Sequence, residues 1–166
     1  AGAADSRGPE APAELSKVVL SIKPRAGRAK PGRPVSVDVF LEGAEDLRLY
    51  EVAVDVVGGH TGDLVLNDVF VDEHRQDFVF AGRSPVIISD PSRQRATSAL
   101  WEGGESTVDG TRYLATYVFV PSHDAWGVFR LLLRAAPGTL LRNSLNQPIV
   151  ISESGAATIE VGKWGR

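Results

Sequence analysis

Apolar and polar residues alternate along most of this chain, which is the pattern of a β-strand with one face in the core and one in water. The alternation is cleanest in VSVDVFLEG (35–43) and LYEVAVDVV (49–57). The side chains of these two segments that we expect in the core are Val35, Val37, Val39, Leu41, Tyr50, Val52, Val54 and Val56.

Further segments of this kind follow one another along the chain, with Gly- and Pro-containing turns between them. The expected strands are residues 17–23, 35–43, 49–57, 63–73, 78–82, 85–89, 96–101, 112–120, 127–136 and 157–161. Residues 137–152 are expected to be part loop and part short hairpin, and no segment has the period of an amphipathic helix. The pattern predicts an all-β protein, a sandwich or barrel of nine or ten antiparallel strands. One domain would span residues 15–162, after a flexible linker or tether at 1–14 and before a tail at 163–166.

Residues 111–121, TRYLATYVFVP, form a strand that is apolar on both faces. The two faces would carry Tyr113, Ala115, Tyr117 and Phe119, and Leu114, Thr116, Val118 and Val120. Either another layer of the fold covers both faces, or one face is kept for a binding partner.

Composition and charge narrow the class of protein. The net charge is −3, so nothing electrostatic favours nucleic acid or an anionic membrane as a partner. No apolar run approaches the ~20 residues of a membrane-spanning helix, so we expect no membrane insertion. The chain has no Met and opens with small residues, which favours an exported protein that has lost a signal peptide, at the cell surface, secreted or in the periplasm. Cys is absent, so there is no disulfide and no thiolate chemistry.

Candidate catalytic and metal-binding residues are few. No nucleophile elbow, zinc-protease, phosphate-loop, dinucleotide or EF-hand motif is present, so we expect no enzyme and no cofactor. The three histidines are far apart in predicted turns. One acidic cluster is a weak candidate for binding Ca²⁺, although the spacing of its residues matches no calcium loop. It consists of Asp68, Asp72, Glu73 and Asp77. Glu102 and Glu105 lie in a Gly-rich turn without any sign of a sugar-binding groove.

Aromatic side chains are the usual platform for stacking sugars, because flat rings pack on pyranose faces. Tyr50 and Tyr117 fall on inward faces, while Trp126 precedes a turn glycine and Trp164 lies in the tail. Trp101 and Tyr113 remain as exposed candidates for sugar stacking.

Three stretches in this order resemble the cohesin family. They are PGRPVSVDVFLEGAEDLRLYEVAVDV, RYLATYVFVPSHDAWGVFRLLLRAA and NQPIVISESGAATIEV, and the similarity covers about residues 17–161. The most specific piece is YLATYVFV with the WGVFRLLL that follows it. Residues 60–77 depart from the family pattern, which usually has an Asp-Pro turn there. The resemblance implies a nine-stranded jelly roll that binds a dockerin-like partner outside the cell and has no catalytic activity.

The resemblance also implies where the partner binds. In the family pattern the partner surface lies on one sheet built from strands 112–120, 49–57 and 127–136, with Ala115, Tyr117 and Phe119 turned inward. The side chains expected on the partner-binding face are Leu49, Glu51, Ala53, Asp55, Leu114, Thr116, Val118, Val120, Arg130, Leu132 and Arg134. An apolar centre beside charges is typical of a protein-binding surface. The alternative is that residues 137–152 fold over this face.

Three classes of function follow from these observations. The first is a cohesin-like module that binds a dockerin-like protein or another copy of itself. The second is a carbohydrate-binding module that recognises a polysaccharide, and the third is a structural subunit of an extracellular filament or lattice.

Overall fold

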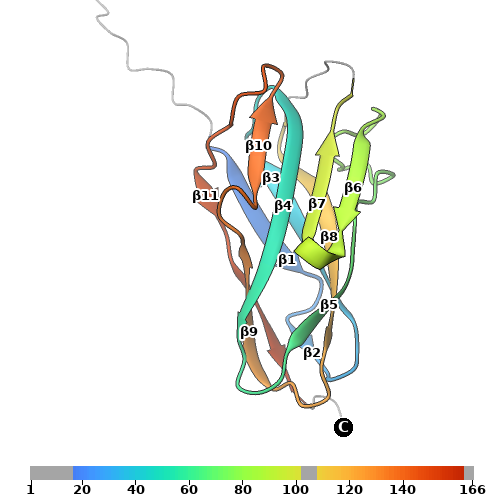
Figure 1. Cartoon of the computed structure of the whole chain (residues 1–166), viewed down its shortest axis with the longest axis vertical. Helices are drawn as coiled ribbons and strands as arrows, with labels where there is room; N and C mark the ends of the chain where they lie inside the picture. Colours follow the sequence, from blue (N-terminus) through green and yellow to red (C-terminus); the bar gives the residue numbers. More distant parts are fainter. Residues whose placement is uncertain (1–16, 102–107, 163–166) are drawn as a thin grey trace, which may run out of the picture.

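Two β-sheets pack face to face in the computed structural model, which describes residues 17–101 and 108–162 (Figure 1). The first sheet has five strands, in the order β11 (Glu153–Ser154), β1 (Val19–Pro24), β3 (Val35–Glu42), β8 (Thr111–Pro121) and β5 (Leu64–Phe70). The second has seven, in the order β2 (Arg28–Ala29), β12 (Ala157–Val161), β9 (Gly127–Leu133), β4 (Leu47–Gly58), β7 (Arg95–Ala99) and β6 (Val86–Asp90), with β10 (Leu140–Asn143) also paired to β4. The predicted all-β sandwich is confirmed, and all pairings except β1–β11 and β2–β12 are antiparallel.

The core lies between the two sheets and holds the side chains that the alternation predicts. Those that are buried as expected are Val35, Val37, Val39, Leu41, Tyr50, Val52, Val54, Ala115, Tyr117 and Phe119. Val56 is only half-buried, and Phe129 and Leu131 of β9 also lie in the core. Two tyrosine side chains form hydrogen bonds from one sheet to the other through the core. The Tyr50 hydroxyl donates to the carbonyl of Leu114 and the Tyr117 hydroxyl donates to the carbonyl of Val52, both at 2.7 Å. Each bond satisfies a polar group inside an apolar layer, because a buried hydroxyl without a partner is costly.

A β-bulge in β8 changes which side chains face the core. Val39 of β3 lies opposite Ala115, but the next residue, Phe40, lies opposite Tyr113, so Leu114 is an extra residue without a partner. Leu114 is fully buried in the core cluster, whereas Tyr113 lies beside Phe40 on the other side of the sheet. The bulge therefore reverses the sides that strict alternation predicts for these two residues, so that Leu114 faces the core and Tyr113 faces outward.

Some predicted elements are wrong in detail. Residues 78–82 form turns rather than a strand, although Phe78, Val79 and Phe80 are buried. The two-residue strands β2 and β11 were not expected, while β10 falls within the hairpin expected at 137–152. The predicted linker at 1–14 and tail at 163–166 lie outside the described residues. Among the residues that the structure describes, no helix is long and apolar enough to cross a membrane.

Candidate functional site

The expected partner-binding face is divided between the two sheets. β8 pairs with β3 and β5, whereas β4 pairs with β9 and β7 in the opposite sheet. The prediction of one sheet made of β8, β4 and β9 is therefore wrong. Leu114, Thr116, Val118 and Val120 do not share a surface with Glu51, Asp55 or Arg130. Partner binding has to be considered separately for the outer face of each sheet.

The outer face of the five-stranded sheet is partly covered, and we call it the capped face. Its outward side chains on β3, β8 and β5 are Ser36, Asp38, Phe40, Tyr113, Thr116, Val118, Val120, Val65, Asp68 and Phe70. Of the β8 residues expected to bind a partner, Leu114 points into the core, Thr116 is fully buried, and Val118 and Val120 are half-buried.

Residues 71–83 provide the cap. Asp77 and Val79 exchange backbone hydrogen bonds with Tyr113, at 2.8 and 3.1 Å. The guanidinium of Arg75 lies 4.1 Å from the centre of the Tyr113 ring, which is within cation–π distance. The Tyr113 hydroxyl in turn accepts a hydrogen bond from the backbone of Asp72. The strand that looked apolar on both faces is thus covered on its outer side at Tyr113 and Thr116.

Asp38 is the centre of a charged network beneath this cap. Its side chain is only 9% exposed and accepts two hydrogen bonds from Arg25 at 3.0 Å and one from the Thr116 hydroxyl at 2.7 Å. Arg75 adds an ion pair at 3.6 Å and also pairs with Asp77. The hydrogen bonds from Arg75 lower the pKa of Asp77 below its ordinary value, and burial raises the pKa of Tyr113.

The outer face of the seven-stranded sheet has exposed apolar side chains on β6, β4 and β9, and we call it the open face. Its outward side chains are Val86, Ile88, Asp90, Arg95, Thr97, Ala99, Leu49, Glu51, Ala53, Asp55, Val57, Val128, Arg130 and Leu132. The alternative that residues 137–152 cover it does not fit the pairing, because β10 lies beside β4 and extends the sheet.

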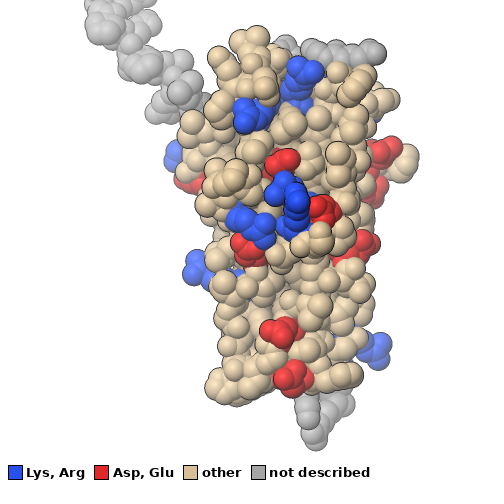
Figure 2. All heavy atoms as spheres, in the orientation of Figure 1, with Lys and Arg blue, Asp and Glu red and all other residues tan. Residues whose placement is uncertain are grey.

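The charged residues of the open face form pairs across neighbouring strands. Arg134, just after β9, binds Asp55 with its Nη2 2.6 Å from the carboxylate, and it also reaches the side chain of Gln94. Glu51 lies 3.8 Å from Arg95 of β7. The hydrogen bond with Asp55 raises the pKa of Arg134. Figure 2 shows positive and negative groups gathered across the middle of the face, with further basic groups near the top and acidic groups near the bottom.

Apolar side chains flank this charged band. Val86 and Ile88 on β6 are exposed, and so are Val57 on β4 and Val128 on β9. Leu49 and Leu132 are half-buried, and Ala53 is fully buried. Val86, Ile88 and Arg95 were not expected on this face, because the sequence pattern does not place β6 and β7 beside β4.

The acidic cluster proposed for Ca²⁺ has other contacts. One carboxylate oxygen of Asp68 accepts from the backbone of Val69, Asp72 accepts from His74, and Asp77 pairs with Arg75. Within residues 17–101 and 108–162 no three His, Cys, Asp or Glu side chains are grouped so that they could hold a metal ion. Glu102 and Glu105 lie outside the described residues.

The predicted sugar-stacking pair does not form. Trp101 is 73% exposed, but Tyr113 is fully buried beneath Arg75. The expectation that Tyr113 is an exposed neighbour of Trp101 is wrong, because the bulge and the cap enclose its ring. Trp126, which was not expected to stack on a sugar, is 55% exposed. Trp164 lies outside the described residues.

Comparison with known proteins shows which solved structures share this fold. No family model matches the chain, and no curated protein matches it in sequence. Solved structures do match. They include the third ScaB cohesin of R. flavefaciens in complex with a group 1 dockerin, with a TM-score of 0.62 and 18% identity over 92% of this chain and 99% of that one.

Two further matches come from other organisms. A non-cellulosomal cohesin from the archaeon Archaeoglobus fulgidus has a TM-score of 0.60 and 14% identity, covering 89% of this chain and 93% of its own. A type I cohesin–dockerin complex from Clostridium thermocellum has a TM-score of 0.59 and 13% identity, covering 89% and 100%. The chain therefore has the jelly-roll fold of cohesin domains, which agrees with the resemblance found in its sequence.

Proposed function

We propose that this domain is a non-catalytic interaction module that binds a dockerin-like protein through its open face. Solved structures of the same fold include cohesins in complex with dockerins. The observation that carries the proposal is the composition of the open face. Exposed apolar side chains lie on either side of charges that are already paired within the domain.

This arrangement suits protein recognition for two physical reasons. Burying Val86, Ile88 and Val128 against a partner removes apolar surface from water, which is the main favourable contribution to association. The pairs Glu51–Arg95 and Asp55–Arg134 are held in place before binding, so a partner with mismatched charges would remove them from water without offering new hydrogen bonds, which costs free energy. The apolar residues provide affinity, and the charges provide selectivity.

The partner would be a dockerin-like protein, that is, a small domain with a tandem calcium-binding repeat, as the resemblance to cohesins implies. The same face would serve if the partner is another copy of this domain. We also propose that the protein acts outside the cytoplasm, at the cell surface or secreted. Fractionation of the native cells followed by immunoblotting tests this location, and detection only in the cytoplasm would contradict it.

The binding experiment compares matched substitutions on the two outer faces. Ile88 on the open face and Val65 on the capped face are both β-branched apolar residues on strands, and they are 58% and 50% exposed. Calorimetric titration with the dockerin domains of the same genome is expected to show binding that Ile88→Asp abolishes and Val65→Asp leaves unchanged. Light scattering on the domain alone tests self-association with the same two variants.

Loss of binding in Val65→Asp with retention in Ile88→Asp would move the site to the capped face. Absence of both dockerin binding and self-association would contradict the proposed function. Melting curves of both variants serve as the control for folding.

A further inference from the structure

Trp126 is held in an exposed position at the end of the sandwich where β8 leads into β9. Trp126 is 55% exposed, which leaves much of its indole ring available to contact a ligand. Its backbone is fixed to the neighbouring turn by hydrogen bonds: the Trp126 amide donates to Thr61 at 2.9 Å, and the His60 amide donates to Trp126 at 2.7 Å.

The indole is also supported from the side. The ring of His60 meets it edge-on, with 4.5 Å between ring centres and an angle of 85° between the planes. Gly127 makes this approach possible: its φ is +110°, and a Cβ there would lie 2.6 Å from the His60 amide nitrogen. The exposed ring is thus part of a rigid surface, with little ordering cost on binding.

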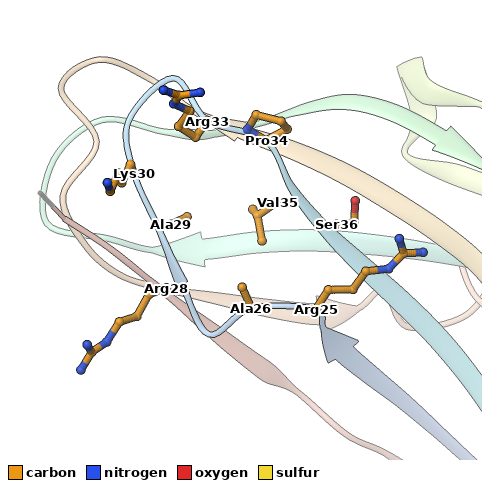
Figure 3. Close-up of a pocket in the computed structure, with 9 residues that line it drawn as sticks. All are labelled: Arg25, Ala26, Arg28, Ala29, Lys30, Arg33, Pro34, Val35 and Ser36. Carbon is orange, nitrogen blue, oxygen red and sulfur yellow. The ribbon is translucent and has the colours of Figure 1, made fainter. Parts of the chain in front are cut away.

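Two hollows border the turn Lys30–Arg33, and the first of them also borders the Trp126 ring. The first, of about 450 Å³, is lined by Pro31 of the turn together with Trp126, His123 and Asp124, whose carboxylate accepts a hydrogen bond from the Ser122 hydroxyl. The second, of about 370 Å³, has walls of Ala26, Ala29, Pro34 and Val35, with basic side chains around its rim (Figure 3). The turn that both hollows border is fixed by hydrogen bonds from Arg33 to Lys30 at 3.0 Å and from Gly32 to Pro121 at 2.8 Å.

The rim is strongly basic in a protein that is acidic overall. Residues 17–37 contain six of the 18 Lys and Arg residues and no Asp or Glu, although the net charge is −3. Arg25 pairs with Asp38, and Arg28 lies 4.0 Å from Glu160. Lys30 and Arg33 are exposed, and within the described part of the chain neither forms an ion pair with a carboxylate. Two unpaired cations on a fixed turn favour an anionic ligand.

We propose that this end of the molecule binds an acidic polysaccharide, with one sugar ring stacked on Trp126 and carboxylate groups of the polymer beside Lys30 and Arg33. A flat, exposed ring packs on the apolar face of a pyranose, and the adjoining cations select uronic acids over neutral sugars. This site lies apart from the middle of the open face, so it does not depend on a dockerin-like partner. It also differs from the Trp101–Tyr113 pair, which the structure does not form.

The test uses an oligomer of galacturonic acid as the probe and its methyl ester as the uncharged control. The wild-type domain is expected to bind the acid form in a titration and to lose affinity as NaCl is raised, because salt screens exposed charges. Trp126→Ala and the double variant Lys30→Gln/Arg33→Gln are each expected to weaken binding about tenfold or more. Trp126→Phe keeps a ring and should retain part of the affinity.

Trp101→Ala is the matched control, because Trp101 is also exposed but follows β7, which ends at the opposite end of the sandwich (Figure 1). Its binding should equal that of the wild type. Failure to bind the acid oligomer, equal binding of the methyl ester, or full binding by Trp126→Ala would each overturn the proposal. The Ile88→Asp variant is expected to bind the oligomer normally, which separates this result from that of the dockerin experiment.

Discussion

The outer faces of the two sheets contain the same kind of group, an aspartate bound to arginine beside apolar side chains, but they use it differently. On the capped face, Asp38 is almost completely enclosed and joins Arg25 from β1's end, Arg75 from the cap and Thr116 from β8. On the open face, Asp55 is 37% exposed and binds Arg134 at the end of the neighbouring strand. The first group holds separate parts of the chain together, whereas the second joins two strands that are already paired.

This difference indicates which charges the fold requires. An enclosed aspartate that loses a partner leaves a buried charge or donor unsatisfied, which costs several kcal/mol. A half-exposed pair on a sheet surface contributes ~1 kcal/mol or less. The open face therefore retains charges that are available for recognition at little cost to stability.

The largest effect is expected where a charge is forced into the core between the faces. Tyr117 is fully buried and its hydroxyl binds Val52, whereas the next residue, Val118, is half-buried on the capped face. Tyr117→Asp is expected to unfold the domain, because an unpaired carboxylate would replace a large core side chain. Val118→Asp is expected to leave it folded. Circular dichroism melting curves of both variants decide this, and equal loss of structure would show that both sides of β8 are internal.

A moderate effect is expected from a matched substitution on each face. Asp38→Asn is expected to lower the free energy of unfolding by about 2–4 kcal/mol, because Arg25, Arg75 and Thr116 lose their common charged acceptor. Asp55→Asn is expected to lower it by less than about 1 kcal/mol. Urea unfolding of both variants measures the two values. Similar losses would contradict the distinction between the capped and the open face.

The smallest effect on stability is expected from the Arg75–Asp77 ion pair of the cap at acidic pH. Arg75 lowers the pKa of Asp77 in the folded protein, so this pair stabilises the fold above the unfolded-state pKa of about 3.9 and loses its effect as the pH falls through the lower, folded value. Asp77 is partly exposed, so we expect less than about 1 kcal/mol from it. Asp77→Asn should make urea unfolding less dependent on pH between pH 5 and 3. An unchanged dependence would show that the pair does not contribute.

The sequence predicted the inward faces of the strands better than the arrangement of the strands. Alternation placed Val37, Val52 and Tyr117 in the core correctly, because the side-chain period of a strand depends only on local geometry. It does not specify which strands become neighbours. The separation of β8 from β4 was therefore missed, and with it the division of the expected partner surface.

Local irregularities account for the other errors. The bulge at Leu114 adds one residue to β8, so Tyr113 lies on the outer face although a strict period of two puts it with Tyr117. Phe78 and Phe80 resemble a strand in sequence but enter the core from turns. The position of Trp126 depends on contacts between two turns far apart in the chain, and no pattern within either turn indicates it.

β4 has hydrogen-bonded neighbours on both edges: β7 along Leu49–Ala53 on one edge, and β10 and then β9 along the other. Local opening of any one neighbour leaves β4 attached through the others. Its central amides are thus exposed to solvent only when the sandwich comes apart as a whole, and their rate of exchange with deuterium reports global unfolding. Under the proposed function, the strand that presents Glu51 and Asp55 to a partner is also the one whose amides are expected to exchange most slowly.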